Sequence, residues 1–300
     1  MTQSKSTAAD LGAIVVCTLA WGTTWFAITR QLGVVDPVVS IVYRFALAAG
    51  LLFLWCFVRR EPLSLNRAQH VEAFGLGFFT FTLNYVFVYW AEASVSSAVV
   101  AVIFASLAFV NLVLFRVVFG QRASAGAWIA ALLGIAGIAI LSWGEVTQSR
   151  YDAGTWTGIM LVFAGVAGSA VGNVFARRGE AVGAPVAAST AWAMLYGVAI
   201  LVAFGLARGV EWRFDMRAPY MLSLLYLSVI GSVVAFLLYY GLARRRGYAM
   251  ASYISALTPP LAMLISTLLE GKHWSAYAYG GVAFVLAGQW LLLRSRKEHN

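Results

Sequence analysis

The sequence predicts an all-α, polytopic membrane protein whose ten transmembrane helices form two inverted five-helix repeats around a central cavity. Composition gives the first reason, because 61% of the 300 residues are hydrophobic and only 11% are charged, whereas soluble domains average about 25% charged residues. The second reason is that the apolar residues fall into ten separate runs. The third is a weak repeat between the two halves, in which matching helices would cross the membrane in opposite directions.

The ten apolar runs are separated by short segments that hold most of the charged residues. A helix that spans a bilayer needs about 20 mainly apolar residues, and every run approaches or exceeds that length. Both cysteines lie within runs, so they form neither a disulfide framework nor a metal-ligand spacing. We expect transmembrane helices over residues 11–30, 38–58, 71–91, 96–118, 126–142, 155–176, 185–207, 219–242, 248–269 and 276–293.

The basic residues predict the orientation of the chain. Of the 21 Lys and Arg, 14 fall on the side of the amino terminus, 6 fall on the other side, and Arg44 lies inside the second run. Cytoplasmic loops carry the excess of Lys and Arg in membrane proteins, so both termini are predicted to be cytoplasmic. The surplus over 12 acidic residues therefore reflects topology and does not indicate nucleic-acid binding.

The repeat rests on residues that recur at a nearly constant separation. Gly12 aligns with Gly158 at 146 residues, and Tyr89 aligns with Tyr239 at 150 residues. Five helices per repeat is an odd number, so the second copy must enter the membrane in the opposite orientation. The loop after the third run has no Lys or Arg, whereas its counterpart in the second half has three consecutive arginines. The predicted repeats are residues 1–145 and 146–300.

Several motifs carry a resemblance to a known family. The chain has LAWGTTWFAI in the first run, YRFALAAGLL in the second, and GSVVAFLLYYGLARRRGYAMASYISALTPPLAML across the eighth and ninth. With ten short helices in two halves, it resembles the EamA-type exporters of the drug/metabolite transporter superfamily over nearly its whole length. The resemblance implies a bacterial inner-membrane exporter of small metabolites that works by alternating access and is not an enzyme.

The resemblance also implies a substrate class and the helices that line the cavity. The chain is similar to aromatic amino acid exporters, which implies aromatic or large neutral amino acids as substrates. A drug or nucleobase-type exporter and an intramembrane enzyme acting on a lipid-linked substrate stay open as alternatives. In this family the central cavity is expected between helices 1, 3, 4, 6, 8 and 9, whereas the small residues of helices 5 and 10 are expected to serve helix packing.

Arg44 is the basic residue that lies well inside an apolar run. A charge at that depth costs at least about 2.5 to 3.5 kcal/mol on insertion scales. It is expected either to be a counter-charge for a substrate carboxylate or the cavity mouth, or to snorkel to the extracytoplasmic interface. Its repeat counterpart is Trp192, so the symmetry of the fold does not require a charge here.

Aromatic and polar side chains at helical spacing predict the cavity lining. Rings with polar atoms suit a solute that is partly apolar and partly polar, although aromatic residues near helix ends also form interfacial belts. Ser, Thr and Asn within membrane helices also bond to backbone carbonyls or join helices, so each one alone has a structural alternative. Together with Arg44, the predicted substrate cavity contains Trp21, Thr24, Trp25, Asn84, Tyr85, Phe104, Asn111, Asn173, Ser232, Tyr239, Ser255 and Thr258.

Pro259 and Pro260 lie inside the ninth run, where they remove two backbone donors and free carbonyl groups that lipid does not satisfy. We expect a helix break or hinge at this point, with the freed carbonyl groups facing a protein-lined cavity. The corresponding positions of the fourth run hold Phe109 and Val110. The two halves are therefore not expected to contribute equally to the cavity.

The acidic residues limit the mechanisms of energy coupling. All 12 lie near the ends of runs or in loops, which disfavours proton exchange through a deeply buried carboxylate. Glu92, at the end of the third run, is the remaining candidate for a coupling residue. The chain lacks a GxxxxGK[ST] phosphate loop and an acid, histidine or metal-ligand cluster at membrane depth, so no cofactor and no metal are expected. The expected partners are a small-molecule substrate and the lipid bilayer, without nucleic acid, and a monomer is expected to suffice.

Overall fold

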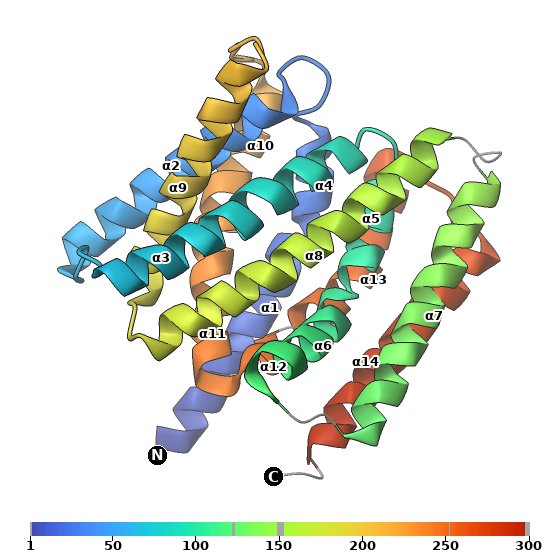
Figure 1. The fold of residues 1–300 in the computed structure, drawn as a ribbon. Helices are drawn as coiled ribbons and strands as arrows, with labels where there is room; N and C mark the ends of the chain where they lie inside the picture. The colour runs from blue at the N-terminus through green and yellow to red at the C-terminus, as the bar shows by residue number, and fades with distance from the viewer. Residues whose placement is uncertain (1, 122–123, 149–152, 252, 298–300) are drawn as a thin grey trace.

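A computed structural model describes residues 2–121, 124–148, 153–251 and 253–297, and within these ranges the regular structure is helical. Each predicted apolar run lies on one helix or on consecutive helical segments (Figure 1). In chain order the segments are α1 Thr2–Thr29, α2 Pro37–Arg59, α3 Arg67–Leu76, η1 Gly77–Asn84, α4 Tyr85–Ala91, α5 Ser97–Phe104, α6 Leu107–Phe119, α7 Ala125–Gln148, α8 Ala153–Ala181, α9 Val186–Ala207, α10 Ala218–Ser228, η2 Val229–Val234, α11 Ala235–Arg246, α12 Tyr248–Ala251, α13 Tyr253–Glu270 and α14 Ala276–Lys297.

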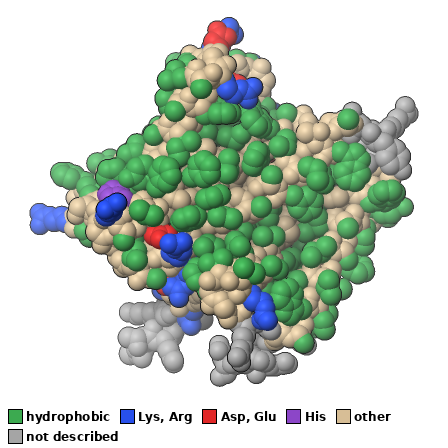
Figure 2. All heavy atoms as spheres, in the orientation of Figure 1, with side chains coloured by type: hydrophobic (Ala, Val, Ile, Leu, Met, Phe, Trp, Pro, Cys, Tyr) green, Lys and Arg blue, Asp and Glu red, His purple; other side chains and the backbone are tan. Residues whose placement is uncertain are grey.

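Length and composition make most of these helices suitable for crossing a bilayer. In the described residues, eight helices or continuous helical stretches qualify, and Leu257–Glu270 and Ala276–Gly288 are shorter apolar helices. Hydrophobic side chains cover the middle of the face shown in Figure 2, and the visible charged groups lie mainly toward its margins. The chain is therefore a multi-pass membrane protein, and the count of ten crossings remains a prediction.

The two halves of the chain pack into one another. Helix α1 of the first half packs against η2, α11 and α13 of the second, and α8 of the second half packs against η1, α4, α5 and α6 of the first. Helix α2 pairs with α9, and α7 pairs with α14 at one edge of the molecule (Figure 1). This reciprocal packing places α1, α8 and the segments between them around one central space.

Small residues allow α7 and α14 to approach closely, as the sequence predicted. A Cβ atom added to Gly281 would lie 2.6 Å from the carbonyl oxygen of Gly137, and one added to Gly288 would lie 2.6 Å from that of Ala130. Real Cβ atoms do not approach backbone atoms this closely, so the two helices touch through their glycines. Helices α7 and α14, which hold the fifth and tenth apolar runs, thus serve packing, and none of their described residues lines the central cavity.

The third and eighth helices contain matching stretches of π-helix, η1 and η2, which end at Asn84 and Val234, 150 residues apart. In each stretch a hydroxyl group satisfies a carbonyl five residues earlier. The Thr82 hydroxyl donates to Gly77 O at 3.2 Å and the Ser232 hydroxyl donates to Leu227 O at 2.8 Å. The wider turn loosens the backbone ladder and leaves carbonyl groups free to accept from neighbouring helices.

The predicted break at Pro259 and Pro260 is wrong, because α13 continues through both prolines. Pro259 has no N–H to donate to the carbonyl of Ser255, four residues earlier. The Thr258 hydroxyl donates to that carbonyl instead, at 3.0 Å. A side chain therefore replaces the missing backbone donor, and the helix is retained.

The fourth helix, which has no proline, is the one that is interrupted. Its axis passes through Ala105 and Ser106, which separate α5 from α6 and have ψ angles of −21° and −17°. The amide of Ser106 donates to Ile103 O at 2.9 Å, three residues earlier, so the chain tightens here into a 3₁₀ turn. At the separation of 150 residues, the counterpart positions in the second half are Ser255 and Ala256, which lie inside the continuous helix α13.

Candidate functional site: a central cavity between the two halves

The central cavity lies where α1, α2, α8, α11 and α13 meet the segments of the third and fourth helices. The space among its side chains, counted with its open mouth, has a volume of about 760 Å³. Both halves of the chain contribute to its wall. Its lining consists of Trp21, Thr24, Trp25, Ile28, Arg44, Thr80, Asn84, Tyr85, Val88, Phe104, Leu107, Ser169, Asn173, Phe236, Tyr239, Tyr240, Ser255 and Thr258.

Eleven of the thirteen predicted cavity residues line this space, and two do not. Asn111 lies behind the wall, where its side-chain oxygen accepts from the Asn173 amide at 3.4 Å. Ser232 also lies behind the wall, fully buried within η2. Each therefore contacts a residue that does line the cavity, Asn111 through Asn173 and Ser232 through Arg44.

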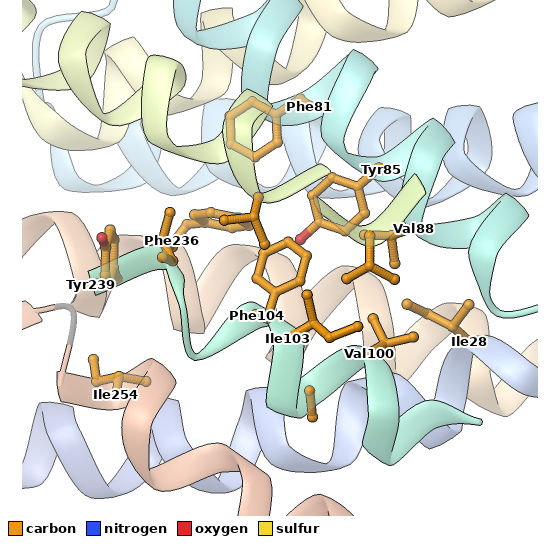
Figure 3. Close-up of a cluster of buried hydrophobic side chains, with 14 of the residues drawn as sticks. Ile28, Phe81, Tyr85, Val88, Val100, Ile103, Phe104, Phe236, Tyr239 and Ile254 are labelled. Carbon is orange, nitrogen blue, oxygen red and sulfur yellow. The ribbon is translucent and has the colours of Figure 1, made fainter. Parts of the chain in front are cut away.

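Aromatic residues make up seven of the eighteen that line the cavity. The ring of Trp21 lies 5.4 Å from that of Phe236 and 5.2 Å from that of Tyr239, and the ring of Trp25 lies 4.9 Å from that of Phe104. Figure 3 shows Tyr85, Phe104 and Phe236 lying near one another, each from a different helix. Tilted and edge-on ring pairs of this kind give an apolar surface with a defined shape.

The π-helical turn η2 positions two of these residues. The Trp21 indole N–H donates to Gly231 O, a carbonyl in η2, at 3.2 Å. The Arg44 Nε–H donates to the Ser232 hydroxyl at 3.0 Å. A side chain on Gly231 would collide with Thr24, whose Cγ2 would lie 2.6 Å from the added Cβ. The close approach of α1 and α2 to η2 thus depends on a glycine here.

Arg44 faces the interior of the protein, so the snorkelling alternative is wrong. The residue is only 1% exposed. Its guanidinium carbon lies 4.6 Å from the centre of the Tyr85 ring, and its Nη2 donates to the Tyr85 hydroxyl at 3.4 Å. Its Nη1 has no hydrogen-bond partner, and among the described residues no carboxylate pairs with it. The cavity therefore holds a buried cation with unused donors.

Polar groups from η1, α8 and α13 face other parts of the cavity. Thr80 and Asn84 come from η1, and the Asn84 side-chain oxygen is buried without a hydrogen-bond partner. Ser169 and Asn173 lie on one face of α8, four residues apart. A few fixed polar groups within mainly apolar walls are typical of sites that orient a small molecule.

Seven lining residues were absent from the predicted set: Ile28, Thr80, Val88, Leu107, Ser169, Phe236 and Tyr240. Their positions follow from spacing relative to predicted residues. Thr80 and Val88 lie four residues before and after Asn84, and Ser169 lies four residues before Asn173. Extending each predicted face by one helical turn would therefore have found several of them.

Glu92, the predicted coupling candidate, does not line the cavity but lies just beyond its end. It follows α4 and is 6% exposed. Neither of its carboxylate oxygens has a hydrogen-bond partner. The nearby Tyr89 hydroxyl donates to the Gln31 side-chain oxygen at 2.7 Å.

Two ion-pair clusters join the two halves at the end of the molecule where α1 begins. Asp10 of α1 pairs with Arg245 and Arg246 of α11, at 3.0 Å and 2.5 Å. Glu72 of α3 pairs with Arg178 of α8 at 3.0 Å. A smaller pocket lined by Glu72 and by Arg244, the neighbour of Arg245, places the two clusters close together. In this conformation the two halves are therefore fastened to each other at this end.

The site has no arrangement suited to holding a metal. Within the described residues, no group of three or more His, Cys, Asp or Glu side chains comes together. The lining offers hydroxyl, amide, indole and guanidinium groups, which bind a solute and are not strong ligands for a transition metal.

The fold and the cavity define a class, a multi-pass helical membrane protein with an aromatic and polar cavity between two interlocked halves. The profile of the EamA-like transporter family matches residues 9–143 and again residues 156–294. The chain belongs to this family, and the double match agrees with two related halves. It is therefore a membrane transporter of the drug/metabolite transporter superfamily, and this family membership indicates a transporter rather than an enzyme.

Named relatives agree with this class. The uncharacterized inner membrane transporter YedA of Escherichia coli (strain K12) is 26% identical over 267 residues, which cover 88% of this chain and 84% of YedA. An uncharacterized transporter of Synechocystis sp. is 24% identical over 289 residues, covering 91% of this chain and 86% of the relative. Protein PagO of Salmonella typhimurium is 27% identical over 126 residues, so the alignment spans 42% of this chain and only 39% of PagO.

A solved structure supports the fold as a whole. A protein crystal structure with 19% sequence identity covers 98% of this chain and 99% of its own chain, with a TM-score of 0.72. At this identity the likeness concerns the fold alone. It extends over both halves of the chain.

Proposed function

We propose that this transporter exports small carboxylate metabolites with an apolar body, foremost aromatic or large neutral amino acids, across a bacterial inner membrane. The two halves, residues 1–145 and 146–300, act as inverted repeats that open the central cavity to alternate sides. Both termini are cytoplasmic, and one chain forms the whole site. The excess of Lys and Arg on the side of the amino terminus supports this orientation.

Arg44 is the observation that carries the substrate assignment. It is a buried guanidinium with a free Nη1 group, it forms no ion pair with any carboxylate in the described part of the chain, and it lies against a cavity. A charge in such a place is costly and is kept where it meets a counter-charge. A solute carboxylate fits the planar donors of a guanidinium, which bind such groups in a side-on pair.

The aromatic wall supports the other part of the assignment. Trp21, Trp25, Phe104 and Phe236 give the cavity that Arg44 also lines an apolar wall of tilted and edge-on rings. An amino acid with an aromatic or large apolar side chain places its carboxylate and its apolar part a few ångströms apart, as these two features require. Cationic drugs are disfavoured by the same arginine, and neutral nucleobases leave it unpaired.

The proposal is tested by counterflow of labelled phenylalanine into liposomes that contain the purified protein and are preloaded with unlabelled solute. Phenylalanine and tyrosine should exchange in this assay. Phenethylamine, which keeps the ring and the amine but lacks the carboxylate, should not. Adenine and the cationic dye ethidium test the nucleobase and drug alternatives. Exchange of phenethylamine at the rate of phenylalanine, or no exchange beyond protein-free liposomes for any amino acid, would contradict the proposal.

A further inference from the structure

The segment that lines the cavity with Thr80, Asn84 and Val88 continues to Glu92. Thr80, Asn84 and Val88 line the cavity at four-residue intervals, and Glu92 is the next residue in that series. One helical turn separates it from Val88, a rise of about 6 Å. Side chains on a helix lean toward its amino terminus, so the carboxyl group of Glu92 leans toward the cavity.

Glu92 is buried without any group to stabilise its charge by direct contact. It is 6% exposed, and both side-chain oxygens lack a hydrogen-bond partner. An ionised carboxylate in such a place is costly, and neutralisation by a proton is the usual outcome. The other buried acids of the described residues, Asp10, Glu72 and Asp215, each pair with an arginine, so Glu92 is the exception among them.

The charged groups around Glu92 are few. Glu270 of α13 and Arg44 of α2, in that order, act on its charge electrostatically. Arg44 also bonds to the hydroxyl of Tyr85, which lies seven residues before Glu92 on the same segment as Tyr89. Arg208 lies over the neighbouring ring of Trp90, 5.7 Å from its centre. The first two turns of α8, which packs against α4, carry no titratable side chain. Arg44 is therefore the cation that connects Glu92 with the cavity.

Several buried hydrogen-bond donors and acceptors on Gln31, Arg44 and Glu92 have no partner in the present conformation. The Gln31 side-chain nitrogen and Arg44 Nη1 lack acceptors, while both oxygens of Glu92 lack donors. Three buried residues with unpaired polar groups are unusual, because buried polar groups are nearly always satisfied. Such a set is expected where a bound ligand or a second conformation supplies the missing partners.

We infer that Glu92 is a proton-binding site and that it takes up its proton together with a carboxylate solute bound at Arg44. This inference rests on the proposed function and adds the coupling ion to it. Burial favours the neutral acid, whereas the positive charge of Arg44 favours the ionised form. A solute carboxylate on Arg44 cancels that charge, so solute binding raises the proton affinity of Glu92. By linkage, the proton raises the affinity for the solute equally.

The proton balance of a cycle follows directly. A water molecule at the open end of the cavity supplies a proton to a Glu92 oxygen, and no electron is transferred. The loaded protein then carries one solute and one proton through the same change of access. When the solute leaves Arg44 on the other side, Glu92 returns the proton to water. Solute and proton therefore move in the same direction, and Glu92 acts by holding charge without contacting the solute.

An infrared pH titration of the solute-free protein tests the proton site without any substrate. The band of a protonated carboxyl group should vanish in Glu92→Gln and remain in Glu270→Gln. In Arg44→Gln, which removes the same positive charge that a bound carboxylate neutralises, the band should persist to higher pH than in the wild type. Loss of the band in Glu270→Gln only, or the same titration midpoint with and without Arg44, would overturn the inference.

Calorimetry with phenylalanine tests the coupling. Titrations in two buffers of different ionisation heat, between about pH 5 and about pH 8, give the protons taken up per solute bound. The wild type should take up close to one proton near the optimal pH, and Glu92→Gln should bind with an uptake of about zero. Glu72→Gln, on the same helix but paired with Arg178, is the matched control and should keep the uptake.

The two tests separate this inference from the proposed function. Phenylalanine binding without proton uptake in the wild type at any pH would overturn the inference and leave the proposed function intact. Absence of any heat of phenylalanine binding would contradict the proposed function. The infrared titration would then decide the proton site by itself.

Discussion

Replacing Arg44 with glutamine should separate solute binding from stability. The substitution removes the buried positive charge and keeps a polar side chain of smaller size. Ser232 loses the Arg44 Nε–H donor at 3.0 Å, yet its own hydroxyl still donates to Leu227 O at 2.8 Å. The change therefore leaves no new unsatisfied group in η2, and the wall of the cavity keeps its backbone.

The size of the effect on binding follows from the donors of the guanidinium. Nε is taken by Ser232, Nη2 bonds Tyr85 weakly at 3.4 Å, and Nη1 is free. A solute carboxylate can therefore accept two charge-assisted bonds, each worth about 1.5 to 3 kcal/mol. Glutamine offers one neutral bond of about 1 kcal/mol. The net loss of about 2 to 5 kcal/mol corresponds to binding weaker by about 30- to 4,000-fold.

The effect on stability should have the opposite sign. A charged residue inside a membrane helix costs about 2.5 to 3.5 kcal/mol on insertion scales, and the lost charge-assisted bond to Ser232 is worth about 1.5 kcal/mol. Arg44→Gln should therefore raise the midpoint of thermal unfolding in detergent, by the equivalent of about 1 to 2 kcal/mol. A residue kept for binding at a cost in stability gives this combination.

Phenylalanine counterflow in proteoliposomes measures binding, and fluorescence-detected unfolding measures stability. Arg59→Gln is the matched control, because it removes one exposed arginine at the end of the same helix. It should change neither quantity. Counterflow by Arg44→Gln at the wild-type concentration dependence, or a lower unfolding midpoint with loss of the folded protein, would refute the reasoning.

Three further predictions concern the rest of the molecule. Asp10→Asn removes both ion pairs to α11. A cysteine introduced into the cavity wall should then react faster with a thiol reagent added on the side of the amino terminus. An unchanged rate of labelling would show that this cluster does not hold that end closed. Gly281→Ala should lower the unfolding midpoint by the equivalent of about 1 to 3 kcal/mol, because its Cβ would lie 2.6 Å from Gly137 O. The Cβ of Gly280→Ala meets no atom within 4 Å, so this variant should raise the unfolding midpoint by the equivalent of about 1 kcal/mol. A shift of the midpoint in the same direction for both variants would contradict the close helix contact. The bond from the arginine two residues later holds the pKa of Asp215 below its usual value. Asp215→Asn should therefore be less stable than the wild type at neutral pH. The difference should begin to shrink as the pH falls through about 3.9, the pKa of an unfolded aspartate, and should disappear only below the depressed pKa of the folded state; a difference that has already vanished above about pH 3.9 would contradict the depressed pKa.

The sequence identified the helices because each apolar run is long and is bounded by charges, so the runs fall on the observed helical segments. It did not identify the interruption at Ala105 and Ser106, where the hydroxyl and the amide of Ser106 both donate to Ile103 O. A serine within an apolar run also bonds to such carbonyls inside continuous helices, so the residue type does not mark the turn. The opposite error arose at Pro259, where the sequence shows the missing donor but not that the Thr258 hydroxyl reaches the carbonyl of Ser255.

The cavity could be predicted where polar atoms and rings recur at helical spacing within runs. Tyr240 was missed because Tyr239 and Tyr240 both line the cavity, which a regular helical period around Tyr239 does not predict. The π-helical turn η2 precedes them and changes the rotation of the helix by an extra residue. Ser232 was predicted to line the cavity but lies within η2, where its hydroxyl donates to Leu227 O and accepts from Arg44 Nε. A sequence pattern does not record the rotation of a helix when the turn itself changes.

A structure of the protein with bound phenylalanine tests the central claim most directly. The carboxylate should lie within hydrogen-bond distance of Arg44 Nη1, and the ring should lie among Trp21, Trp25 and Phe104 in the central cavity. The apolar groove between α6, α7 and α8, lined by Trp128 among others, is a second place for an apolar ring. Phenylalanine ordered in that groove, or in the central cavity with its carboxylate away from Arg44, would contradict the account.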